Sequence, residues 1–137
     1  MKFHHIGFLS EDVERDMAAF DMLFGKMTWS ARFEDPEQDV IARFGRTAEG
    51  LVYELVQPRS DKSPVVRSLK ARQNIINHLC YRCEDLAETT AELRSQGAVP
   101  IGAPRRGVAF SGRLIQFFYM ANGMLLEIVE GHEGPFA

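Results

Sequence analysis

The chain has 137 residues, of which 45% are hydrophobic and 26% are charged, and its formal net charge is −3. These values are typical of one globular domain and exclude a disordered chain. The small acidic net charge excludes a global attraction to nucleic acid or to an anionic membrane, so we expect partners that are small molecules.

The first half of the chain predicts the element order βαβββ. An apolar run over residues 2–9 predicts a strand that begins without the apolar core of a signal peptide, and no segment is long and apolar enough to span a bilayer. We therefore expect a cytoplasmic protein. Ser10 is the expected N-cap of a helix that ends at Gly25. Three further strands are predicted near residues 27–34, 39–45 and 51–57.

The second half predicts the same order after a polar connector, residues 59–74, in which a short helix is expected from Pro64 to Arg72. Asn122-Gly123 indicates a type I′ hairpin between the last two strands. The predicted elements are a strand over 75–83, a helix over 85–96 that stops at Gly97, and strands near 98–102, 113–119 and 124–130. The single domain thus divides into module one at about 1–58, module two at about 75–130 and an expected mobile tail, 131–137.

One His/Glu pair occurs twice in these strands. His5 and Glu54 are followed 73 positions later by His78 and Glu127. Side chains alternate across a strand, so each of the four shares a face with apolar neighbours two positions away. A carboxylate on such a face costs several kcal/mol unless a partner compensates it. A divalent cation would neutralise both carboxylates and use both imidazoles, which predicts a metal site.

The repeat extends beyond the four residues and supports a duplication. At the same offset Glu11-Asp12-Val13 matches Glu84-Asp85-Leu86. The two cysteines, Cys80 and Cys83, have C-x-x-C spacing, but residues three apart on a strand point to opposite faces. No second cysteine pair completes a tetrahedral zinc set, so we expect buried, reduced thiols.

Three segments carry a resemblance to a known family. His5-Ile6-Gly7, His78-Leu79-Cys80-Tyr81 and Leu125-Leu126-Glu127-Ile128-Val129-Glu130 resemble the strand motifs of the vicinal oxygen chelate superfamily, which contains glyoxalase I, methylmalonyl-CoA epimerase, extradiol dioxygenases and bleomycin-resistance proteins. The resemblance is strongest to methylmalonyl-CoA epimerases and glyoxalase I-like proteins. It implies an α+β fold of two tandem βαβββ modules that form an open barrel-like sheet, and a homodimer, with modules paired within one chain or between two.

The resemblance also implies a site and a reaction. His5, Glu54, His78 and Glu127 would ligate one divalent ion, and this donor set is compatible with zinc, nickel, cobalt, manganese or iron(II). The implied enzyme is a metal-dependent isomerase or lyase that removes a proton next to a chelated carbonyl or thioester through an enediolate. Glu127 is the first candidate for the base and Glu54 the second.

Two alternatives and one departure remain. A small-molecule binding or resistance protein is the runner-up, and an extradiol dioxygenase is disfavoured because a fourth protein ligand occupies a position that oxygen chemistry needs. Epimerases of the family are expected to carry a second acid at the position of Ala42, which puts two-base epimerisation in doubt. Three arginines near a small-residue loop are candidates for binding a substrate phosphate or carboxylate, namely Arg105, Arg106 and Arg113.

Overall fold

The computed structural model describes residues 1–73 and 75–136, which form two compact units. The N-terminal unit comprises His5–Asn77 together with Phe136. The C-terminal unit comprises Met1–His4 and His78–Pro135. The predicted connector and the predicted tail each end at a residue outside the described part, residues 74 and 137.

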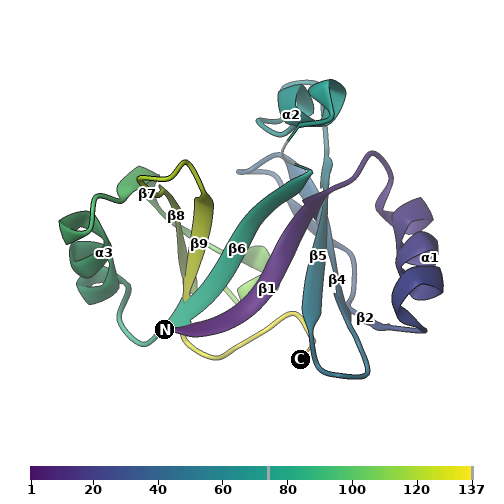
Figure 1. Ribbon diagram of the computed structural model, residues 1–137, viewed down its shortest axis with the longest axis horizontal. Coiled ribbons are helices and arrows are strands. Elements are labelled where there is room, and N and C mark those ends of the chain that lie inside the picture. The colour runs from purple at the N-terminus through teal and green to yellow at the C-terminus, as the bar shows by residue number, and fades with distance from the viewer. Residues whose placement is uncertain (74, 137) are drawn as a thin grey trace. The chain divides into compact units, whose positions relative to one another are not determined.

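The N-terminal unit is a mixed sheet with the strand order β2-β4-β5-β1 (Figure 1). β3 also pairs with β4. β1 and β5 are parallel, whereas β4 and β5 are antiparallel. The elements that contribute to this unit are β1 (Lys2–Leu9), α1 (Val13–Phe24), β2 (Thr28–Trp29), β3 (Phe33–Asp35), β4 (Val40–Arg46), β5 (Val52–Pro58) and α2 (Val66–Ala71).

The C-terminal unit repeats this plan, with the strand order β6-β9-β8-β7. β6 and β9 are parallel, and the other two pairs are antiparallel. Its elements are β6 (Ile76–Cys83), α3 (Leu86–Ser95), β7 (Val99–Arg106), the 3₁₀ helix η1 (Val108–Phe110), β8 (Leu114–Tyr119) and β9 (Leu125–Glu130). The predicted α+β fold with a repeated strand and helix order is confirmed.

Each unit buries one face of its sheet under a helix. In the N-terminal unit Val13 of α1 packs with Ile41 and Leu55. In the C-terminal unit Leu86 and Leu93 of α3 pack with residues that include Phe118 and Ile128. Because side chains alternate along a strand, the residues between these core positions point to the opposite face. That face carries the repeated histidines and glutamates.

Two local predictions are wrong for physical reasons. Ser10 is not the N-cap of α1; the Asp12 carboxylate accepts the backbone N–H groups of Glu14 and Arg15, and the Ser10 hydroxyl donates to Asp16 instead. The strand expected over 27–34 is interrupted between β2 and β3, where the hydroxyl oxygen of Ser30 accepts the backbone N–H of Phe44. The Ser30 side chain thus takes the place of a backbone carbonyl as the hydrogen-bond acceptor for β4, and the regular strand pairing stops there.

The hairpin between β8 and β9 forms as predicted, but its turn differs. A type I′ turn needs positive φ at both central residues. Gly123 has a φ of 85°, but Asn122 does not have a positive φ. Among the described residues, the non-glycine residues with positive φ are Asp39, Arg72 and Ser111. The Asn122 side chain instead accepts the backbone N–H of Met124.

The start of the expected tail is held by two arginines of the C-terminal unit. The guanidinium of Arg82 donates to the carbonyl oxygens of Gly131 and Glu133 at 2.9 and 2.7 Å, and Arg113 pairs with the Glu133 carboxylate.

Among the described residues, none of the helices has the length and apolar character needed to cross a membrane.

Candidate metal centre

The N-terminal unit brings His5 and Glu54 together on the face opposite α1. Gly7 of β1 is the register partner of Glu54 in the parallel pair of β1 and β5, so His5, two residues before Gly7, lies on the same face as Glu54. The His5 Nε2 atom is 2.9 Å from Glu54 Oε2, and the side chains are 0% and 12% exposed. A histidine and a carboxylate are thus buried in direct contact.

The C-terminal unit holds the second pair in the same way. Cys80 of β6 is the register partner of Glu127 in the parallel pair of β6 and β9, which places His78 and Glu127 on one face. His78 Nε2 lies 3.5 Å from Glu127 Oε1, and the two side chains are 3% and 6% exposed. The duplicated sequence pattern therefore corresponds to a duplicated local geometry.

Each pair has the spacing of two neighbouring ligands on one divalent ion. Nitrogen and oxygen ligands bind at about 2.1 Å, so two of them are about 3.0 Å apart at a right angle and about 3.4 Å apart at the tetrahedral angle. The observed separations of 2.9 and 3.5 Å match these values. Imidazole and carboxylate also suit first-row divalent metals. A metal-free ion pair has similar separations, so metal binding is a proposal that the geometry permits.

A third residue, a phenylalanine that was not among the predicted site residues, repeats beside the His–Glu pair of each unit. Phe44 is the register partner of Glu54, and Phe117 is the register partner of Glu127. Each ring lies edge-on to the histidine of its own unit: the centroids of His5 and Phe44 are 5.2 Å apart and those of His78 and Phe117 are 5.6 Å apart, both at 84°. The two phenylalanines are also 73 positions apart, so extending the module alignment into the third strand would have found them.

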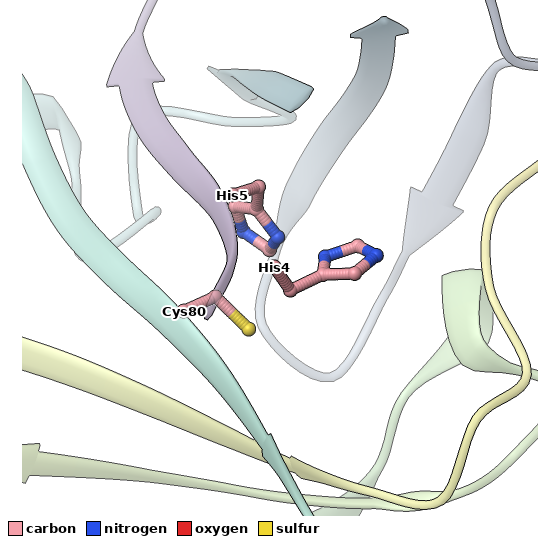
Figure 2. Close-up of side chains that lie close together, drawn as sticks. All are labelled: His4, His5 and Cys80. Carbon is pink, nitrogen blue, oxygen red and sulfur yellow. The ribbon is translucent and has the colours of Figure 1, made fainter. Parts of the chain in front are cut away.

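His4 belongs to the other face of β1, because it alternates with His5. Its ring lies edge-on to Phe110, with 5.5 Å between the centroids, and a nitrogen of its ring lies within 4.8 Å of the Cys80 thiol. Figure 2 draws His4 and His5 as consecutive residues of β1 and Cys80 on β6. Cys80 and Cys83 are both buried and neither forms a disulfide, as expected.

The structure separates the three arginines predicted to bind an anion. Arg105 is the register partner of Ile115, and Ile115 lies on the same face of β8 as Phe117, so Arg105 shares the face of the His78–Glu127 pair. Arg106 follows on the opposite face, where its guanidinium donates to the carbonyl oxygen of Gly112.

Arg113 is paired with an acid. Its guanidinium donates twice to the carboxylate of Glu133. This hydrogen bonding lowers the pKa of Glu133 to about 2 and raises that of Arg113. Of the three arginines, Arg105 is therefore the one that the register places on the face of the His78–Glu127 pair.

Comparison with known proteins gives a consistent fold. The chain resembles methylmalonyl-CoA epimerase from Mycobacterium tuberculosis, with a TM-score of 0.83 and 24% identity over 96% of this chain and 88% of that one. A hypothetical protein from Bacillus halodurans C-125 gives the same TM-score and identity over 96% and 95% of the two chains.

A third solved structure is that of a Streptomyces coelicolor methylmalonyl-CoA epimerase variant in complex with 2-nitronate-propionyl-CoA. It has a TM-score of 0.81 and 22% identity over 96% of this chain and 97% of that one. None of the curated proteins compared with the chain matches it. The sequence profile of the Glyoxalase/Bleomycin resistance protein/Dioxygenase superfamily matches residues 4–117. The chain therefore belongs to this superfamily, as its repeated motifs indicated.

Proposed function

We propose that this protein is a divalent-metal-dependent isomerase or lyase that removes a proton next to a carbonyl or thioester group. Its metal ligands are His5, Glu54, His78 and Glu127. The observation that carries the proposal is the duplicated His–Glu pair, which has ligand-like spacing and low exposure in both units. Two buried carboxylates need compensation, and one shared cation supplies it to both.

A bound divalent ion would polarise the substrate carbonyl and stabilise the negative charge that develops on its oxygen. The chain itself must then supply a base within hydrogen-bond reach of the acidic C–H. Each candidate lies beside the histidine of its own unit, Glu54 at 2.9 Å from His5 and Glu127 at 3.5 Å from His78. As the family resemblance implies, Glu127 is the first candidate for the base and Glu54 the second.

The proposed substrate class is an acyl thioester with an acidic proton on its α-carbon. Solved relatives of the same fold are complexes of methylmalonyl-CoA epimerase with 2-nitronate-propionyl-CoA and with methylmalonyl-CoA. Arg105 supports this class because it shares the face of Glu127, where a guanidinium can bind a carboxylate or a phosphate through paired hydrogen bonds. Arg105→Ala is expected to raise the KM for such a substrate more than it lowers kcat.

Titration with Co(II), followed by its visible absorption, tests the shared metal site. The wild type should bind one ion per chain, and either His5→Ala or His78→Ala should strongly weaken binding, because each removes half of one chelating pair. His132→Ala is the matched control, since His132 is 70% exposed and pairs with Glu84. Two ions per chain, each lost with one histidine, would show two separate sites. No binding would favour a metal-free small-molecule binder.

Solvent exchange tests the chemistry. Methylmalonyl-CoA incubated in D₂O with the metal-loaded protein should acquire deuterium at the α-carbon, detected by mass spectrometry. Glu127→Gln should abolish this exchange and keep measurable Co(II) binding, because the amide oxygen remains a ligand but cannot accept the proton. Glu54→Gln should weaken Co(II) binding and retain exchange at saturating metal. Exchange that survives in Glu127→Gln would remove Glu127 from the role of base.

A further inference from the structure

The repeated phenylalanines occupy equivalent positions around the two His–Glu pairs. In each unit the phenylalanine is the cross-strand neighbour of the glutamate and touches the histidine edge-on at the same angle, 84°. Cross-strand neighbours have their Cβ atoms about 5 Å apart, so one aromatic ring can contact both members of a pair. The duplicated unit is therefore a His–Glu–Phe triplet.

The torsion of a histidine side chain does not by itself fix the ring, so contacts with neighbouring groups contribute to its orientation. The terminal χ2 angle of histidine has broad minima, so rotamer preference leaves the ring plane loosely defined. Metal affinity, however, depends on the direction of the ligand nitrogen, and groups that orient ligand histidines commonly change affinity by about 10- to 100-fold when they are removed. An edge-to-face aromatic partner restricts the ring plane without using either ring nitrogen.

We propose that Phe44 and Phe117 are positioning residues that hold the imidazoles of His5 and His78 with Nε2 directed at the glutamate and the metal. The inference rests on the proposed function for its link to metal. Phe44 is itself fixed, because it is 1% exposed and its ring packs edge-on against Phe33 at 6.1 Å between centroids. A ring held in this way can transmit its orientation to His5.

Leucine variants test the role, since leucine keeps an apolar side chain on the strand and removes the ring. Phe44→Leu and Phe117→Leu should each weaken Co(II) binding by about tenfold and shift the visible Co(II) spectrum. Phe118→Leu is the matched control: Phe118 is the next residue of β8, is 0% exposed and packs in the α3 core on the other face. It should lower the unfolding temperature and leave Co(II) affinity unchanged.

A rescue variant separates the role of the ring from general packing. Phe117 is only partly buried, so Phe117→Tyr keeps the aromatic ring at a position that the surrounding side chains do not fully enclose. We expect this variant to keep the Co(II) affinity and spectrum of the wild type. Unchanged affinity in both leucine variants, or equal loss in Phe117→Tyr and Phe117→Leu, would overturn the positioning role.

A metal-free measurement distinguishes failure of this inference from failure of the proposed function. Long-range ¹H–¹⁵N NMR spectra report the tautomer of each imidazole in the protein without metal. The wild type and Phe118→Leu should show one tautomer each for His5 and His78, and Phe44→Leu should give a mixture for His5. A wild type that binds no Co(II) but shows this difference supports the positioning role and contradicts only the metal proposal. Identical spectra in all three proteins contradict the positioning role.

Discussion

Removal of one ligand histidine should abolish most of the stabilisation that a divalent ion gives to the folded protein. His78→Ala is the informative change, because His78 and Glu127 lie in the C-terminal unit while His5 and Glu54 lie in the N-terminal unit. If the four side chains bind one ion, a change in one unit must weaken metal binding as a whole. If each His–Glu pair binds its own ion, the unchanged pair still binds metal and still stabilises the fold.

The size of the effect follows from ligand linkage and from the chain length. At a free Co(II) concentration of 100 times Kd, binding stabilises the fold by about 2.7 kcal/mol. For 137 residues, an unfolding entropy of about 2.1 cal/mol/K per residue makes 1 kcal/mol equal to about 3.5 °C. The wild type should therefore gain about 9 °C. A variant with Kd raised about 100-fold should gain only about 0.4 kcal/mol, or about 1.5 °C.

Differential scanning calorimetry with and without Co(II) measures this gain. The comparison uses the metal-induced shift of Tm, because loss of a buried ring lowers the Tm of His78→Ala by itself. His5→Ala should lose the shift equally, and His132→Ala should keep it. A full shift in either His5→Ala or His78→Ala would refute the idea of a single shared ion.

Three further predictions concern the rest of the chain. Gly45→Ala should lower the free energy of unfolding by about 1–3 kcal/mol in urea titrations, because the added Cβ would lie 2.6 Å from atoms of Met27 and Trp29; a neutral result would contradict this packing. An NMR titration should give Glu133 a pKa of about 2, below its ordinary 4.5, owing to Arg113. Its pairing should therefore stabilise the fold above pH 4.5 and be lost as pH falls towards 2, and an unchanged value in Arg113→Ala would contradict that cause. Burial raises the pKa of the Cys83 thiol, so iodoacetamide at pH 8 should modify Cys83 only after unfolding, and rapid labelling of the native protein would disagree.

The regular parts of the fold were predictable because the sequence repeats itself. Gly25 has a φ of 79° at the end of α1, as its position after an amphipathic run predicted. The breaks in regularity were not predictable from local patterns. Ser30 interrupts a strand because its hydroxyl oxygen accepts a hydrogen bond from Phe44, fourteen residues later. Asp12 and not Ser10 is the N-cap of α1, because at Ser10 the chain still pairs with β5: the backbone N–H of Ser10 donates to the carbonyl oxygen of Val56.

The candidate site was predictable for the charged residues and not for the aromatic ones. A histidine or glutamate in an apolar strand is unusual, so each such residue can be recognised as a site candidate from the sequence alone. Phenylalanines on strands are common core residues, so Phe44 and Phe117 become informative only through the register that pairs them with Glu54 and Glu127. The placement of Arg105 likewise depends on strand register, and the pairing of Arg113 depends on Glu133. The spacing of the arginines reveals neither.

The face that carries Glu54 also bears on the stereochemistry of the proposed reaction. Ala42 of β4 is 7% exposed, so the position expected for a second acid carries a buried methyl group. Asp35 is the register partner of Val40 on this face, but its carboxylate accepts the backbone N–H groups of Glu37 and Gln38 and the side-chain amide of Gln38. Those bonds commit the Asp35 carboxylate to the turn. A second acid that delivers a proton from the opposite side is therefore missing from these two positions, and the arrangement favours proton transfer by one glutamate on one side of the substrate.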